Sequence, residues 1–208
     1  MAFEKIAPLE IERRSFEIIT REIGVHNFPP EVAAVVMRVI HTSADFDYAV
    51  NLRFSPGAVS LGIAALRDGA SIVTDTTMAL AGISKPALAK LGCTARCYIA
   101  DEDVTAQAAD EGTTRAEIAV RRAVEDGAEI FVVGNAPTAL IALDRLIAEG
   151  KSAPKLVIAV PVGFVNVVEA KELFMNCETP SIVAAGRKGG SSVAAAIVNA
   201  LLYQIAER

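Results

Sequence analysis

From Gly69 onward, short apolar runs of β-forming residues alternate with longer helix-period segments rich in Ala and Leu. Loops containing Gly, Pro, Asp or Asn separate the two kinds of segment. The short runs are apolar at successive positions, which is typical of parallel strands covered by helices on both faces. The predicted strands cover residues 70–74, 96–100, 130–133, 156–160 and 181–185.

This alternation predicts an α/β fold. Too few βα units are present for an eight-stranded barrel, so we expect an open, doubly wound, mainly parallel sheet of about five strands with helices on both faces. Helical spacing predicts helices over residues 114–126, 138–148 and 192–206. The less regular first 66 residues predict helices over 11–22, 30–40 and 57–68, which we expect to form an N-terminal cap on a single domain spanning 1–208.

Composition excludes several classes of protein. Hydrophobic residues make up 52% of the 208 residues, yet no apolar run approaches the roughly 18 to 20 residues of a membrane span. A net charge of −5 argues against a general nucleic-acid binder. The first 20 residues mix acids and bases and have no apolar stretch before a cleavage site, so we expect a cytoplasmic protein.

The three cysteines give little support for a metal or redox site. Cys93 and Cys97 have C-x3-C spacing, but no second pair follows and both histidines lie far upstream. Cys177 makes the count odd, so a disulfide framework is not expected. We predict reduced thiols and no metal ligands in the protein.

Two glycine-containing loops each follow a predicted strand and precede a predicted helix, over residues 134–138 and 186–192. Exposed N–H groups at a helix start favour anions, and the second loop adds Arg187 and Lys188. Neither loop has the order of a P-loop or of a dinucleotide-binding fingerprint. The alternative is that these glycines only shape the ends of strands and helices.

Two further loops lie where the same edge of the sheet is expected. Residues 161–166 are apolar and aromatic, which suits the face of a broad ring. Residues 74–78 supply hydroxyls and a carboxylate, although a cap for the following helix also explains them. Together the four loops predict a wide ligand that carries several carboxylates or phosphates.

His26 and His41 are the only imidazoles in the chain. His26 lies in a predicted turn, where a solvent-exposed role is the simpler interpretation. His41 ends an apolar helical run, so it is either a complement to the helix dipole or a general acid or base. Ser15 follows Arg13 and Arg14 in the first helix, where a basic surface stripe is the default interpretation.

Five separated motifs resemble one family, the precorrin-8X methylmutases. They are IERRSF at residues 11–16, HTS at 41–43, RFSP at 53–56, GNAPTAL at 134–140 and PVGFV at 161–165. They occur in one collinear order, and the resemblance extends from about residue 11 to residue 201.

The resemblance implies an isomerase of cobalamin biosynthesis that moves a methyl group from ring carbon 11 to ring carbon 12 of a corrin-type macrocycle, precorrin-8X or cobalt-precorrin-8, giving hydrogenobyrinate or cobyrinate. It implies His41 as the general acid and Ser15 as a substrate contact. Further expected contacts are Arg14, Thr76, Arg115, Asn135, Thr138, Arg187 and Lys188.

The same resemblance implies a reaction without a cofactor and a homodimer with its active site near the subunit interface. Residues 41–47 and 74–78 look more like the branch of the family that acts on the cobalt-containing macrocycle. Two alternatives remain open: a tetrapyrrole carrier without catalytic activity, and a Rossmann-like enzyme that holds a phosphate ligand on residues 186–192.

Overall fold

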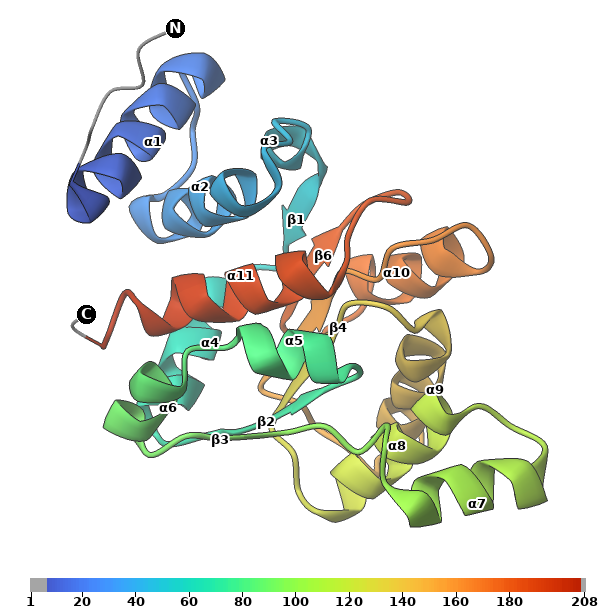
Figure 1. Cartoon of the computed structure of the whole chain (residues 1–208). Helices are drawn as coiled ribbons and strands as arrows, with labels where there is room; N and C mark the ends of the chain where they lie inside the picture. The colour runs from blue at the N-terminus through green and yellow to red at the C-terminus, as the bar shows by residue number, and fades with distance from the viewer. Residues whose placement is uncertain (1–6, 207–208) are drawn as a thin grey trace, which may run out of the picture.

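A computed structural model describes residues 7–206, which form an α/β structure around one six-stranded sheet with strand order β1-β6-β5-β4-β2-β3 (Figure 1). β2 to β6 are parallel, and β1 runs antiparallel to β6 at one edge. The strands are β1 (Leu52–Phe54), β2 (Ser71–Thr74), β3 (Thr94–Arg96), β4 (Ile130–Val133), β5 (Leu156–Ala159) and β6 (Ser181–Ala184).

The structure corrects two strand predictions. β1 was missed because it has three residues, too few to show a strand pattern, and its pairing partner β6 lies far along the chain. The strand predicted over residues 96–100 was placed too late in the chain, since the observed β3 ends at Arg96. The residues after it have turned toward the helices, where Tyr98 is buried and donates its hydroxyl to Asp126 at 2.6 Å.

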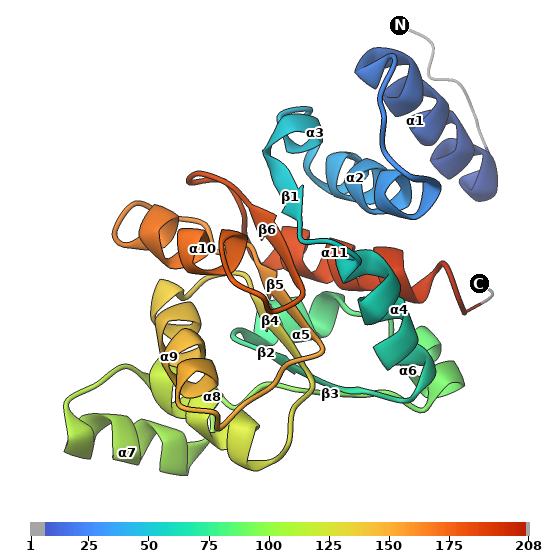
Figure 2. The ribbon, with the colours of Figure 1, turned by 180° about the vertical axis from the view of Figure 1, so that it is seen from behind.

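Helices cover both faces of the sheet (Figures 1 and 2). One face is covered by α4 (Ala58–Arg67), α5 (Thr77–Gly82), α6 (Lys85–Leu91) and α11 (Ser191–Leu202), and α2 (Pro30–Ser43) packs on α11. The other is covered by α7 (Glu102–Glu111), α8 (Arg115–Glu125), α9 (Pro137–Ala148) and α10 (Val167–Met175). The doubly wound α/β prediction is confirmed.

Alternating side chains divide the core into two layers. In β4, Ile130 and Val132 pack on the α11 side, whereas Phe131 and Val133 pack on the α8 and α9 side. Every residue of this strand is buried, which explains why the sequence is continuously apolar rather than alternating.

Local sequence signals set several helix ends. Thr114 caps α8 by accepting the Glu117 N–H at 3.2 Å, and Pro137 occupies the first turn of α9. Gly127 takes a φ of 74° directly after α8 and Asp126, as expected of a C-terminal glycine.

The N-terminal cap consists of α1 (Pro8–Ile23), α2 and the short α3 (Tyr48–Asn51). α2 packs along α11, and α1 lies on the outer side of α2 (Figure 1). Within residues 7–206, no helix combines the length and apolarity needed to cross a bilayer.

Candidate active site at the carboxyl edge of the sheet

The loops that follow the parallel strands meet at one edge of the sheet, where ligands bind in open α/β folds. The Thr76 hydroxyl, after β2, lies 2.7 Å from the Ser191 hydroxyl at the start of α11. The Gly163 N–H, after β5, donates to the Arg187 carbonyl at 3.2 Å. These contacts bring three of the four predicted loops into one surface.

A buried carboxylate occupies the start of α9. Asp75, at the end of β2, accepts the backbone N–H groups of Gly134, Asn135 and Ala136 at 2.9, 2.7 and 2.7 Å. Burial raises the pKa of the Asp75 carboxyl, and the three donors oppose that shift by stabilising the ionised form. The anion that we expected from a ligand on these backbone groups is therefore supplied by the protein itself.

Gly134 also has a structural explanation. A Cβ at this position would lie 2.9 Å from the Ser191 Cα, so only glycine allows the loop to pack against the start of α11. This packing accounts for Gly134 without a ligand, in line with the alternative that the glycine shapes the strand end and the helix start. Of residues 134–138, the side chains of Asn135 and Thr138 remain as candidate contacts.

The second glycine loop carries an exposed cation above an exposed ring. The Arg187 guanidinium lies 5.5 Å from the centre of the Phe164 ring, within the range of a cation–π contact. Phe164 is 81% exposed, and Val165 and Met78 are also largely exposed. This combination offers a broad apolar surface beside a carboxylate-binding group.

Lys188 is held by two carboxylates that sequence reasoning missed. Its Nζ lies 2.6 Å from Asp45 and 2.6 Å from Asp47, in the turn that follows α2. The hydrogen bonds that Lys188 donates to these two carboxylates raise the pKa of its ammonium. The ion pairs bring the segment carrying His41 against the β6–α11 loop, so Lys188 connects the cap to the sheet edge.

His41 lies in the last turn of α2 with its side chain exposed. Its ring stacks on Phe16 of α1, with 5.2 Å between ring centres and 28° between ring planes. Ser15, the neighbour of Phe16, donates its hydroxyl to the Ile11 carbonyl at 2.8 Å. Arg14 lies 3.1 Å from Glu10.

Arg115 and Thr138 lie at the starts of α8 and α9, on the same side of the sheet as the loops above. The Thr138 hydroxyl lies 3.1 Å from the Thr114 hydroxyl, and Arg115 makes a long contact of 3.5 Å with the Ile99 carbonyl. Each side chain thus contacts a segment outside its own helix.

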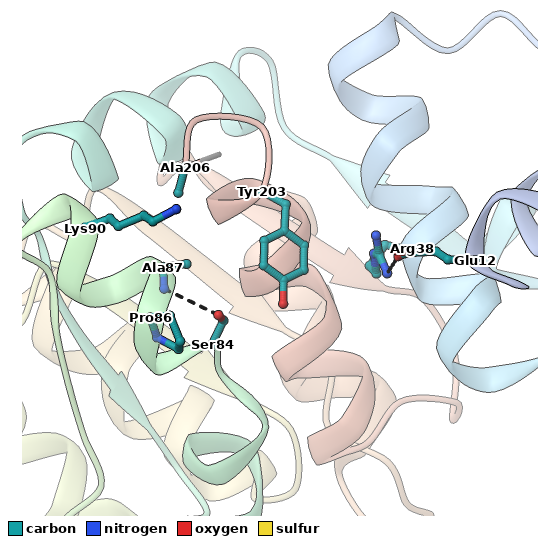
Figure 3. Close-up of a pocket in the computed structure, with 8 residues that line it drawn as sticks. All are labelled: Glu12, Arg38, Ser84, Pro86, Ala87, Lys90, Tyr203 and Ala206. Atoms are coloured by element: carbon teal, nitrogen blue, oxygen red, sulfur yellow. Dashed lines mark hydrogen bonds and ion pairs between the residues drawn. The ribbon is translucent and has the colours of Figure 1, made fainter. Parts of the chain in front are cut away.

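Two adjoining hollows lie elsewhere, between the cap and the end of α11. One has a volume of about 290 Å³, and Figure 3 shows Tyr203 between Arg38 on one side and Ser84 and Lys90 on the other. An adjoining hollow of about 480 Å³ is lined in part by Phe16. Among the described residues, the linings include none of the predicted site residues, so the hollows are separate from the carboxyl-edge surface.

Residues 10–204 match the family model of precorrin-8X methylmutase. The chain is 45% identical to a cobalt-precorrin-8 methylmutase of Priestia megaterium, over 94% of this chain and 88% of that protein. It is 46% identical to a cobalt-precorrin-8 methylmutase of Salmonella typhimurium, over 96% and 97% of the two chains. A precorrin-8X methylmutase of Pseudomonas aeruginosa is 38% identical, over 92% and 93%.

A solved structure agrees with these sequence matches. The crystal structure of a precorrin-8X methylmutase from Thermus thermophilus superposes with a TM-score of 0.87 at 44% identity, covering 93% of this chain and 94% of that one. Sequence and structure therefore agree over almost the whole length of the chain, which belongs to the precorrin-8X methylmutase family.

Proposed function

We propose that the protein is a cytoplasmic, single-domain methylmutase of cobalamin biosynthesis that converts cobalt-precorrin-8 to cobyrinate. The observation that carries this proposal is full-length similarity to methylmutases, combined with an exposed apolar and cationic surface beside the turn that carries His41. The reaction moves one methyl group from ring carbon 11 to ring carbon 12 within a single molecule, so it needs neither a methyl donor nor a redox cofactor.

The surface has the chemistry that such a substrate requires. A corrin-type macrocycle has a broad apolar face, which suits the exposed Phe164, Val165 and Met78 side chains. Its rim carries carboxylates, which suit the Arg187 guanidinium. Ser15, Arg14, Thr76, Arg115, Asn135 and Thr138 are proposed as further contacts, and Lys188 as a contact whose ammonium is shared with Asp45 and Asp47.

His41 is the proposed general acid. A proton delivered to the macrocycle allows its double bonds to reorganise while the methyl group migrates in a 1,5-sigmatropic shift. The exposed imidazole is accessible to a ligand, and its stack on Phe16 restricts the orientation of the ring. Fixing the donor in this way lowers the entropic part of the barrier.

Replacing His41 tests this role. His41→Ala is expected to lower the rate of cobyrinate formation by about 100- to 10,000-fold, the usual contribution of a positioned general acid. Stopped-flow absorbance measures the rate, and an absorbance titration with cobyrinate measures binding, which is expected to persist.

His26→Ala is the matched control, because His26 is the other imidazole and lies in the loop between α1 and α2. It should turn over at nearly the wild-type rate. An unchanged rate in His41→Ala would remove this residue from the mechanism. A wild-type protein that binds the macrocycle and never converts it would instead be a carrier.

Two finer parts of the proposal have their own measurements. Comparing the rates with cobalt-precorrin-8 and metal-free precorrin-8X tests the preference for the cobalt-containing substrate.

A homodimer with its active site near the interface is supported by the exposed apolar side chains of Ile11 and Ile18 on α1 and of Phe164 and Val165 at the sheet edge. Sedimentation equilibrium measures the mass of the protein in solution. A mass equal to that of one chain would contradict the homodimer.

A further inference from the structure

A buried lysine lies directly behind the β6–α11 loop. Lys171 is on α10, which lies beside β6 in both views of the fold (Figures 1 and 2). Its side chain is fully buried, with 0% of its surface exposed. The Nζ donates to the Gly186 and Lys188 carbonyls, each at 2.8 Å.

Within residues 7–206, Lys171 has no carboxylate partner, and its ammonium donates to these two carbonyls alone. Desolvation lowers the pKa of the Lys171 ammonium to about 8. Burying an ammonium without a counter-charge is unfavourable, and an apolar side chain of similar length would fill the same space without that penalty. The two hydrogen bonds are therefore what distinguishes lysine from methionine or leucine at this position.

These bonds fix the orientation of two peptide groups. The Gly186 and Lys188 carbonyls point at Lys171, and in a trans peptide the next N–H points the opposite way. The N–H groups of Arg187 and Gly189 are thereby directed away from the buried lysine. Between them, the Arg187 carbonyl accepts the Gly163 N–H, so three successive carbonyls of this loop are bonded within the protein.

The donors of the loop are left for another acceptor. Within the described part of the chain, no backbone or side-chain acceptor receives the N–H groups of Arg187, Lys188 or Gly189. They belong to the loop that carries the Arg187 guanidinium, which lies over the exposed Phe164 ring. A flipped peptide would present a carbonyl oxygen instead, which repels a carboxylate.

We propose that Lys171 is a positioning residue for the methyl transfer, which locks the β6–α11 loop with its amide donors and Arg187 turned toward the carboxylates of the substrate. The proposal rests on the proposed function, since it concerns the same substrate. Lys171 itself touches the loop and not the ligand. It acts on binding, whereas His41 acts on the chemical step.

The test compares Lys171→Met, Lys171→Arg and the control Phe174→Leu, a substitution of another buried residue of α10. Losing hydrogen bonds from a charged donor is expected to raise the KM for cobalt-precorrin-8 and the Kd for cobyrinate at least about 10-fold in Lys171→Met, with a smaller change in kcat. Lys171→Arg should recover part of the affinity. Phe174→Leu should lower the melting temperature and leave KM near the wild-type value.

Wild-type KM and Kd in a folded Lys171→Met variant would overturn the proposal, provided that the wild-type enzyme converts cobalt-precorrin-8. Absence of conversion by the wild type would instead contradict the proposed function. If neither lysine variant folds, the proposal is tested on the wild-type protein by NMR. Titration of the protein, labelled with ¹⁵N at Arg and Gly, with cobyrinate should shift the amide signals of Arg187 and Gly189, and unchanged signals would overturn the proposal.

Discussion

The two glycine loops at the carboxyl edge of the sheet look alike in sequence and are supported in opposite ways. In the β4–α9 loop, a buried carboxylate, Asp75, takes up three backbone N–H groups. In the β6–α11 loop, a buried ammonium, Lys171, takes up two backbone carbonyls. The N–H groups of the first loop are already bonded to a carboxylate of the protein, whereas those of the second loop are available to a ligand.

The difference shows that glycine before a helix is insufficient to define an anion site. Backbone N–H groups bind a ligand only when no internal acceptor already satisfies them. The charge of the side chain behind the loop decides which backbone groups are satisfied. Here that side chain comes from the residue directly after β2 in one case and from α10 in the other.

Removing the buried carboxylate is expected to have the largest effect on stability. Asp75→Ala leaves the buried Gly134 N–H and the partly buried N–H groups of Asn135 and Ala136 without their acceptor, so the free energy of unfolding should fall by at least about 3 kcal/mol. Urea denaturation measures it. Asp68→Ala, at the exposed end of α4, is the control and should change stability by less than about 0.5 kcal/mol. A stable Asp75→Ala protein would mean that the β4–α9 loop does not depend on its internal anion.

The buried Lys171 ammonium should change how the free energy of unfolding depends on pH. Because burial lowers the pKa of Lys171 from 10.5 to about 8, the unfolded chain binds more protons than the folded one between these values. The unfolding free energy of the wild type should therefore rise relative to Lys171→Met, by roughly 2 kcal/mol between pH 8 and pH 10.

The control for this pH series is Lys155→Met, measured by urea denaturation at the same pH values. The hydrogen bond that Lys155 donates to Glu129 raises the pKa of the Lys155 ammonium, so its linkage to folding begins only above 10.5 and has the opposite sign. A wild-type curve parallel to that of Lys171→Met over pH 8 to 10 would contradict a depressed pKa at Lys171.

Substitutions in the two loops should differ in their effect on cobyrinate binding, and this difference is the smallest of the expected effects. Arg187→Ala removes a charged donor from the open loop and is expected to weaken cobyrinate binding about 10-fold. Asn135→Ala removes one neutral side chain from a loop whose backbone donors are already used, so about 3-fold is expected. Absorbance titration gives both Kd values. An effect of Asn135→Ala equal to or larger than that of Arg187→Ala would reverse the ranking of the two loops.

Much of the fold was predictable because its signals are local. Four of the five predicted strands match the observed β2, β4, β5 and β6 to within one residue at each end, since each is a continuous apolar run with turn residues at its ends. The edge strand β1 was missed because three residues show no pattern, and its pairing with β6 is a long-range contact. β3 was misplaced because Tyr98 belongs to the packing of the next layer rather than to the strand.

The site was less predictable, because its charges are satisfied across long stretches of chain. The Arg187 and Lys188 pair looks like two free cations in sequence, yet Lys188 is bonded to Asp45, 143 residues earlier. Asp75 lies 59 residues from Gly134. Lys171 lies between Glu169 and Glu172, so in sequence it looks like one more surface charge of a helix.

The sequence by itself determined the doubly wound sheet, the loops that meet at its carboxyl edge and the family to which the chain belongs. These follow from periodicity and from motifs, which depend on neighbours in the chain. The tertiary structure alone decided which loop keeps its amide donors, because a hydrogen-bonding group is available or occupied according to what packs behind it in space. At the same carboxyl edge, Asp75 accepts the backbone N–H groups of one loop, whereas Lys171 bonds the carbonyls of the other and leaves its N–H groups available.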